Sequence, residues 1–311
     1  MSTSAEPTAT SGKIWVALDD RAIIRVGGPD ARDFLQNLVS SDLAKVGPDR
    51  AIHAALLTPQ GKFLHEFFIA QADGAFLLDC GRQRRDDLIR RLTMYKLRAQ
   101  VEIADAADDY AVFALLGERA IEGKEGTAAA LGSGIVFVDP RLAALGARAI
   151  LPAANATAIL AAADFSEAGL DTYEDHRVTL GVPDGGRDLV VEKSFLLENN
   201  FEELNGVDFE KGCYVGQEVT ARSKHRGLVK KRMLPVQASS PLPGSGTKIT
   251  LDGKDAGVMF SSVGTRGLAL LRLERVEEAA RAGTEFSSDG TKLRAIVPDW
   301  LTLPETQVSR A

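Results

Sequence analysis

Short apolar runs of strand length dominate the first part of the chain, with stretches of helical spacing between them. Ile14–Leu18 and Ala22–Val26 flank the polar residues Asp19–Arg21 and predict a β-hairpin. After Gly28-Pro29, apolar residues recur every three or four positions, which predicts a helix with one apolar face. The residues of this face are Ala31, Phe34, Leu35, Leu38 and Val39.

The same alternation continues to about residue 105. Ile52–Leu57 and Phe63–Ala70 read as paired strands joined by a Pro-Gly turn. Arg82–Tyr95 has the composition of a helix, and Ala99–Ile103 that of a strand. The order strand, helix, strands, helix, strand predicts a ferredoxin-like α+β unit over residues 14–105.

A second α+β unit is predicted over residues 106–228, with an element order that roughly repeats the first. Its expected elements are a strand at Tyr110–Leu116, a weak helix at Glu118–Leu131, strands at Ile135–Val138 and Ala147–Leu151, and a helix at Asn155–Ala163.

From residue 229 to the end the pattern changes to short strands. Asp252-Gly253 and Asp289-Gly290 each stand between two strand-like runs, and Asp-Gly in that position is a strong hairpin signal. This region therefore predicts a small antiparallel β-barrel. The fold class is α+β, with two ferredoxin-like units and a C-terminal barrel.

Composition restricts the setting. The chain has 311 residues and a net charge of -6, which gives no general attraction to nucleic acid or to a membrane. Two cysteines, Cys80 and Cys213, predict neither a disulfide framework nor an intrinsic metal site. Residues 1–13 are polar and lack a secretory or transit pattern, so we expect a disordered tail on a cytoplasmic protein.

One segment is far more specific than these patterns. Lys211-Gly-Cys-Tyr-Val-Gly-Gln-Glu218, followed by Ala221-Arg222, resembles the signature of the YgfZ-type family of aminomethyltransferase-like proteins. Arg177–Pro183 and the basic strip of residues 222–232 also look familial. The resemblance implies a fold like the glycine-cleavage T-protein, in which two α+β units and a barrel surround a channel for reduced folate. It also implies a role in assembling or repairing iron–sulfur proteins, and an indirect one in tRNA modification.

Two departures from the T-protein pattern count against simple aminomethyl transfer. His65 and Glu66 stand where T-proteins carry paired aspartates, and Thr179 stands at a glutamate position. Strand geometry points His65 and Glu66 to opposite faces, and we expect Glu66 to face the channel. A folate-dependent one-carbon transferase or demethylase, with Glu66 as its carboxylate, is therefore the alternative, and whether the protein is an enzyme stays open.

Cys213 is the candidate functional thiol, because Lys211 and Arg222 favour the thiolate and Gly212 and Gly216 allow close approach. Its expected role is transient contact with an iron–sulfur cluster or redox chemistry, while Cys80 is expected to be structural. For Tyr214 packing is the favoured interpretation over stacking on a pterin. The residues expected to bind folate or a partner are Arg177, Lys211, Gly212, Tyr214, Gly216, Gln217, Glu218, Arg222 and Arg232.

The expected cofactor is tetrahydrofolate or a derivative, and the expected partners are iron–sulfur assembly or client proteins. The basic strip would hold a folate tail, an acidic partner or RNA phosphates. A tRNA-binding module is the remaining alternative, and the acidic total and the lack of interleaved aromatic residues count against it.

Overall fold

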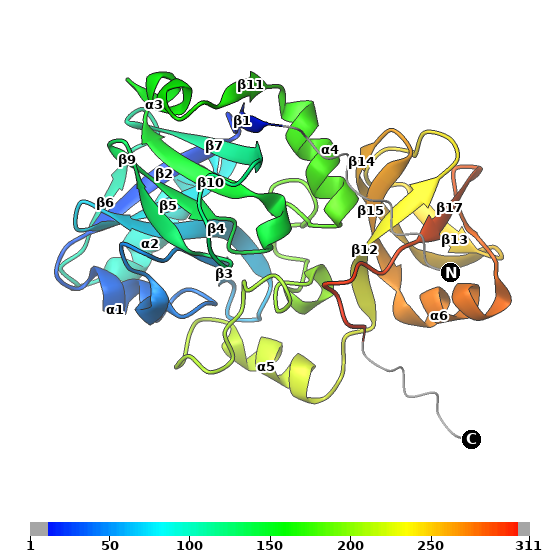
Figure 1. Ribbon diagram of the computed structural model, residues 1–311. Helices are drawn as coiled ribbons and strands as arrows, with labels where there is room; N and C mark the ends of the chain where they lie inside the picture. The colour runs from blue at the N-terminus through cyan, green and yellow to red at the C-terminus, as the bar shows by residue number, and fades with distance from the viewer. Residues whose placement is uncertain (1–11, 304–311) are drawn as a thin grey trace.

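The computed structural model describes residues 12–303 and shows two β-sheets, packed face to face, beside a closed barrel. Helix α4 (Leu170–Leu180) lies between the second sheet and the barrel and contacts strands of both (Figure 1). The predicted α+β class and the C-terminal barrel are confirmed. The predicted tail falls outside the described residues except for its last two, of which Lys13 already belongs to a strand.

The first unit is a five-stranded sheet of order β3-β4-β5-β2-β6. Its outward face is covered by the two helices of the unit, which bury a cluster of aliphatic and aromatic side chains against it. Its elements are β2 (Arg21–Gly27), α1 (Ala31–Gln36), β3 (Ile52–Leu57), β4 (Phe63–Ala72), β5 (Ala75–Gly81), α2 (Arg85–Lys96) and β6 (Glu102–Asp105).

The second unit is a six-stranded sheet of order β11-β1-β7-β10-β9-β8, with α3 (Ala156–Ala162) on its outer face. Along its shared strands, the order β8-β9-β10-β7 matches β3-β4-β5-β2 of the first unit, so the expected repeat of topology is confirmed. Its strands are β1 (Lys13–Ala17), β7 (Tyr110–Gly117), β8 (Ala128–Leu131), β9 (Gly134–Val138), β10 (Ala147–Pro152) and β11 (Ser166–Ala168).

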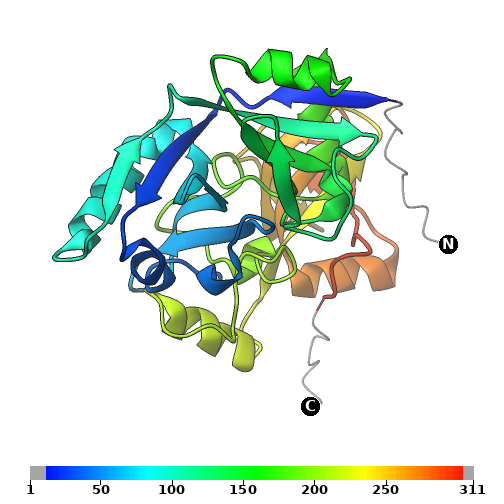
Figure 2. The ribbon, with the colours of Figure 1, turned by 60° about the vertical axis from the view of Figure 1, so that its left-hand side comes forward.

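Two local predictions in these units are wrong. The expected hairpin does not form, because β1 pairs with β7 and β11 in the second sheet while β2 pairs with β5 and β6 in the first. Figure 2 shows the two blue strands separating into different sheets. The weak helix over 118–131 is a loop followed by β8, and Gly123 and Gly126 take positive φ within that loop.

The inner faces of the two sheets share one core, which includes Ile23 and Phe68 from the first and Phe137 and Ile150 from the second. The layers therefore run helices, sheet, sheet, helix. This arrangement matters for the site, because any polar side chain that points inward from either sheet is enclosed by both.

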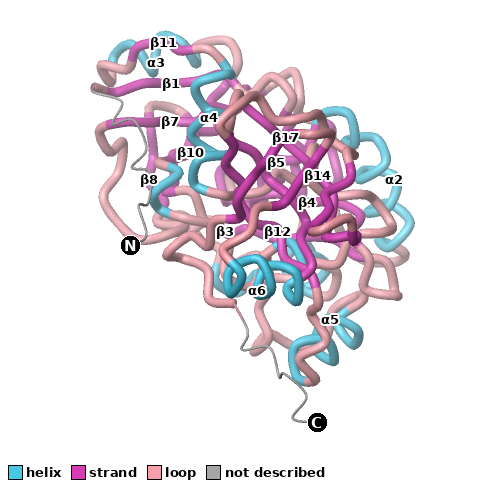
Figure 3. The backbone as a smooth tube through the Cα atoms, turned by 90° about the vertical axis from the view of Figure 1, so that its right-hand side faces the viewer, coloured by secondary structure: helices cyan, strands magenta, loops and turns pink. Residues whose placement is uncertain are grey.

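The barrel closes in the order β12-β15-β14-β13-β16-β17 and is covered at one side by α6 (Leu273–Ala282) (Figures 1 and 3). Asp252-Gly253 and Asp289-Gly290 form its predicted hairpin turns, and all four residues have positive φ. The strands are β12 (Lys231–Ala238), β13 (Lys248–Leu251), β14 (Lys254–Val263), β15 (Arg266–Arg272), β16 (Phe286–Ser288) and β17 (Thr291–Ala295). Helix α5 (Gln217–His225) precedes the barrel, and none of the described helices is both long and apolar enough to cross a bilayer.

Candidate functional site

Oppositely charged side chains fill the space between the two sheets. Asp79 at the end of β5 accepts hydrogen bonds from Arg21 Nε at 2.6 Å and from Arg148 Nη1 at 2.6 Å. Asp139 binds Arg141 through both carboxylate oxygens, at 3.0 and 2.8 Å, and Arg148 at 3.2 Å. All five side chains are buried, so these pairs join the first unit to the second without access to solvent.

The aromatic ring of Phe68 stands at the centre of this charge network. The guanidinium carbon of Arg148 lies 4.0 Å from the ring centroid, and those of Arg141 and Arg21 lie at 5.0 and 5.4 Å. Tyr173 of α4 accepts hydrogen bonds from Arg141 and Arg148 at 3.1 Å. Cation–π contacts and bidentate ion pairs thus hold the guanidinium groups in fixed places.

Glu66 points from β4 into this buried interior. His65 points to the opposite side of β4, where its Nε2 lies 2.9 Å from Asp87 of α2. Burial acts to raise the pKa of Glu66, but the hydrogen bond from His53 and two neighbouring arginine charges outweigh it, and the pKa lies well below its usual range.

His53 and Glu66 form a buried pair. The ring nitrogens of His53 lie 2.9 Å from the Leu204 carbonyl oxygen and 3.0 Å from Glu66 Oε1. Both partners are hydrogen-bond acceptors when Glu66 is ionised. The ring is also held between Phe68 and Phe201, with centroid distances of 5.3 and 4.8 Å.

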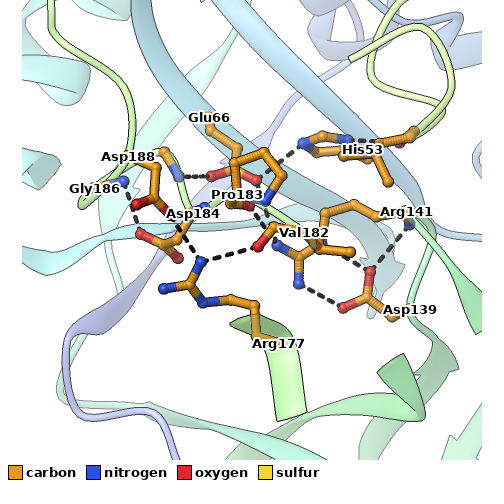
Figure 4. A network of polar contacts seen from close by, with 12 residues as sticks. His53, Glu66, Asp139, Arg141, Arg177, Val182, Pro183, Asp184, Gly186 and Asp188 are labelled. Carbon is orange, nitrogen blue, oxygen red and sulfur yellow. Dashed lines mark hydrogen bonds and ion pairs between the residues drawn. The ribbon is translucent and has the colours of Figure 1, made fainter. Parts of the chain in front are cut away.

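The loop that follows α4 closes over Glu66 (Figure 4). The Gly185 backbone N–H donates to Glu66 Oε2 at 2.6 Å, and a Cβ on Gly185 would lie 2.4 Å from that oxygen. Asp184, on the same loop, is buried, and burial together with the charge of Glu66 raises its pKa. Each oxygen of Glu66 therefore already accepts a hydrogen bond from the protein, in a site closed to solvent.

Arg177 belongs to α4, just before this loop, and is fully buried. It donates to Asp188 at 2.7 Å, to Glu174 at 2.7 Å and to Ser261 of the barrel at 3.0 Å. Because these contacts join α4, the loop and the barrel, Arg177 acts as a clamp between units rather than as an open ligand contact.

A cavity of about 500 Å³ opens beside the charge network, between the two α+β units and the segment after the 182–188 loop. Its inner wall includes Ile52, His53, Val207 and Phe209. Its cationic side chains are Lys45, Arg50, Lys124 and Lys224, and its carboxylates are Glu125, Glu202, Asp208 and Glu210. Since His53 lines the cavity and also binds Glu66, the network and the cavity share one residue.

The signature segment directly follows residues 207–210 of the cavity lining and is anchored by Lys211. The Lys211 ammonium is buried and donates to the carbonyl oxygens of Gln36, Val39 and Ser41 at 2.7, 2.5 and 3.0 Å. Burial lowers the pKa of Lys211 to about 8. These bonds fix the loop against the end of α1.

Two further residues of the segment are packed tightly. Tyr214 is buried in a cluster with Leu57 and Phe63, and burial raises its pKa to about 12. Gly216 has φ of +84°, and a Cβ there would lie 2.5 Å from the Thr58 carbonyl oxygen. Cys213 stands between these anchors and is exposed.

Comparison with known proteins identifies the chain. Residues 19–123 match the GCVT N-terminal domain, and residues 230–303 match the CAF17 C-terminal beta-barrel domain. The mouse and human proteins named iron–sulfur cluster assembly factor IBA57, mitochondrial, are both 33% identical to it, over 93% and 96% of this chain and 86% and 88% of their own lengths. The chain belongs to the IBA57 family of iron–sulfur cluster assembly factors.

The fold of the chain also matches a solved structure. The crystal structure of the glycine cleavage system aminomethyltransferase T from Bartonella henselae matches with a TM-score of 0.77, over 94% of this chain and 87% of that one. At 16% identity this likeness shows the fold alone. The two domain matches and the IBA57 relatives confirm the YgfZ-type resemblance. The expectation of a cytoplasmic protein is wrong, because the mouse and human relatives are named as mitochondrial.

In this IBA57-family structure the other predicted residues have local partners. Glu218 and Arg222 pair with each other on exposed positions of α5, and Gln217 is the first residue of that helix. Arg232 is buried and pairs with Glu203 at 2.7 Å. Gly212 is in open surroundings, so it allows no special approach. None of these residues, nor Arg177, Lys211, Tyr214, Gly216 or Cys213, lines the 500 Å³ cavity.

The charge network itself was absent from the sequence-based prediction. A signal did exist, since Asp79, Arg148 and His53 interrupt runs that are otherwise apolar and strand-like. A charged residue inside such a run must find a partner when the strand is buried on both faces. The sequence does not say which partner, because Asp79 and Arg148 are 69 positions apart.

Proposed function

We propose that this IBA57-family chain acts in iron–sulfur cluster assembly by presenting the Cys213 thiol on a fixed surface loop. The observation that carries the proposal is the contrast within the signature: Lys211 and Tyr214 are buried, and Cys213 between them is exposed. An exposed thiol on an anchored loop can reach a cluster held by another protein.

A single thiol sets the kind of chemistry. Thiolates are the usual ligands of iron–sulfur clusters, and clusters of the common types need four of them. Within residues 12–303 no three His, Cys, Asp or Glu side chains form a metal-binding group. Cys213 would therefore contribute one ligand to a cluster whose other ligands come from a partner, with the cluster as cargo rather than as a resident cofactor.

We further propose that the 500 Å³ cavity binds a reduced folate. Ile52, Val207 and Phe209 provide an apolar and aromatic wall for a flat ring, which is the usual character of a small-molecule site. Arg50 fits an anionic ligand, because its Nε is buried and has no hydrogen-bond partner among the described residues. Phe209 belongs to the loop that carries Cys213, so an occupant of the cavity would help to order that loop.

The one-carbon transferase alternative is not favoured by the site. Glu66 would have to contact substrate, but His53 and the Gly185 N–H already occupy its two oxygens. A base also needs a solvent or substrate path, and Glu66 is buried.

The tRNA-binding alternative is weakened by ion pairing in the basic strip. Arg222, Lys224 and Arg232 pair with Glu218, Glu202 and Glu203. Three of the six cations between 222 and 232 are thus neutralised locally, which leaves less charge for a phosphate backbone.

The thiol proposal is tested in a strain that lacks the protein, by comparing rescue of iron–sulfur enzyme activity by wild type and by Cys213→Ser. We expect the variant to accumulate normally and to fail in rescue. Cys80→Ala is the matched control, since Cys80 is buried and burial raises its pKa to about 12. Full rescue by Cys213→Ser would overturn the thiol role.

The folate proposal is tested separately by calorimetry with tetrahydrofolate and the purified chain. Binding should be lost when Val207 is replaced by Trp, which fills the inner wall, and kept in Arg226→Gln on the exposed strip. No heat of binding with wild-type protein would remove folate from the proposal and leave the thiol role standing.

A further inference from the structure

Some of the charged side chains that line the 500 Å³ cavity form ion pairs with each other, and others do not. Four cations and four carboxylates line it, so its net charge is close to zero. Lys45 is paired with Asp208 at 2.5 Å, and Lys224 with Glu202 at 2.5 Å. Each of these two pairs is neutral, and the charged residues left in the lining are Arg50, Lys124, Glu125 and Glu210.

The remaining cations, Arg50 and Lys124, have no ion pair and no side-chain hydrogen bond in the part of the chain that the structure describes. Among the described residues Glu125 and Glu210 form no ion pair with either cation, and one Glu125 oxygen accepts the Ala143 backbone N–H at 3.2 Å. The Nε of Arg50 is buried without a hydrogen-bond partner among the described residues, and an unpaired buried N–H is costly unless a ligand supplies an acceptor.

Arg50 and Lys124 come from different units and are brought to one cavity by backbone pairing. The Ala51 N–H donates to the Gly126 carbonyl at 2.8 Å, and the Ala128 N–H donates to the Asp49 carbonyl at 2.8 Å. Gly126 takes φ of +81°, and a Cβ there would lie 2.4 Å from the Ala51 carbonyl oxygen. The position of the two cations is therefore set by a fixed contact between segments rather than by mobile side chains alone.

We infer that Arg50 and Lys124 bind the anionic end of the cavity's ligand, with its flat body against the wall near Phe209 and His53. The inference rests on the proposed folate function, and for a reduced folate the anionic end is the glutamate tail. This inference places the binding site of the folate tail at Arg50 and Lys124, whereas the sequence alone points to the basic strip of residues 222–232. Two cations that line one cavity suit a tail with more carboxylates, so the site should prefer folates with more than one glutamate.

The test is a calorimetric comparison of 5-formyltetrahydrofolate carrying one glutamate with the same compound carrying three. In the wild-type protein the longer tail should tighten binding by about tenfold, the size of two partly exposed ion pairs. Arg50→Gln with Lys124→Gln should abolish that gain, so that the two compounds bind the variant with equal affinity, and should also weaken monoglutamate binding, because the first glutamate already carries two carboxylates. Arg226→Gln, on the exposed strip, is the matched control and should keep the full gain.

The possible failures are distinguishable. Monoglutamate binding with no gain from the longer tail, or a gain that is lost in Arg226→Gln instead, would overturn the Arg50–Lys124 assignment and leave folate binding intact. No binding of either compound would overturn both. Inorganic triphosphate that displaces the triglutamate form through Arg50 and Lys124 as strongly as free triglutamate does would assign the pair to phosphate ligands and overturn the glutamate preference.

Discussion

The neutral, buried His65 makes the stability of this protein depend on pH in a way that can be measured. The His65 side chain is 2% exposed and its Nε2 lies 2.9 Å from Asp87 Oδ2. Burial lowers the pKa of His65 to about 4, and the charges of Arg84 and Arg91 act in the same direction. An unfolded histidine has a pKa of about 6.5.

The sign follows from proton binding. Between these two values the unfolded chain holds a proton at His65 that the folded chain does not, so acid favours unfolding. Stability is fully present above about pH 6.5 and is lost as the pH falls toward the folded pKa of about 4. Between about pH 7 and about pH 5 the difference of the two titration curves amounts to about 2 kcal/mol.

The assay is urea unfolding at about pH 7 and about pH 5, for wild type and for His65→Gln, where the amide can still donate to Asp87. Wild type should lose about 2 kcal/mol more than the variant over this interval. Asp184 has a raised pKa and acts in the opposite direction, but it is present in both proteins and cancels in the comparison. His225→Gln, at an exposed position, should behave as wild type. An equal acid loss in His65→Gln and wild type would refute the reasoning.

Three further changes test the structural account. Asp79→Asn removes a charge that Arg148 and a second arginine share, so urea unfolding should show a loss of about 3–5 kcal/mol; a loss under about 1 kcal/mol would mean that the network is dispensable. Gly216→Ala places a side chain at positive φ against a carbonyl and should lower stability by at least about 1–3 kcal/mol, while Gly212→Ala, in open space, should be close to neutral; equal effects would contradict the packing described. Lys211→Met leaves three carbonyl groups without their donor and should speed alkylation of the signature thiol and lower the urea midpoint; unchanged values of both would show that the loop is held by other contacts.

The parts of the fold that sequence predicted well are those determined by neighbours in the chain. Asp252-Gly253 and Asp289-Gly290 specify hairpin turns by their own backbone preferences, and both turns form. For the hairpin predicted around Asp19–Arg21, both strands form, but they pair with other strands and not with each other. A period of two identifies a strand but carries no information about which strand lies beside it, and here Ala17 pairs with Phe113 while Ile23 pairs with Asp79.

The site shows the same limit more strongly. The signature predicted an important loop, and the loop is indeed anchored on both sides of Cys213. The structural roles of Lys211 and Tyr214 could not be predicted from the sequence. A lysine whose ammonium binds three backbone carbonyls cannot be told by sequence from a lysine that activates a thiol. Burial decides between such interpretations, and burial here depends on segments some 170 positions away.

The closed centre of the molecule favours the proposed location of the chemistry at the surface. Ion pairs around Phe68 and the loop over Glu66 leave the carboxylate without an open approach, although the chain folds like an aminomethyltransferase. Opening that centre would separate several buried charges, each at a cost of several kcal/mol. A cluster or a partner protein is also too large to enter such an interior. The chemistry proposed for Cys213 needs no such opening, because the thiol is exposed and Phe209 of its loop lines the neighbouring cavity. A ligand bound there, as proposed, would act on the thiol while the core stays closed.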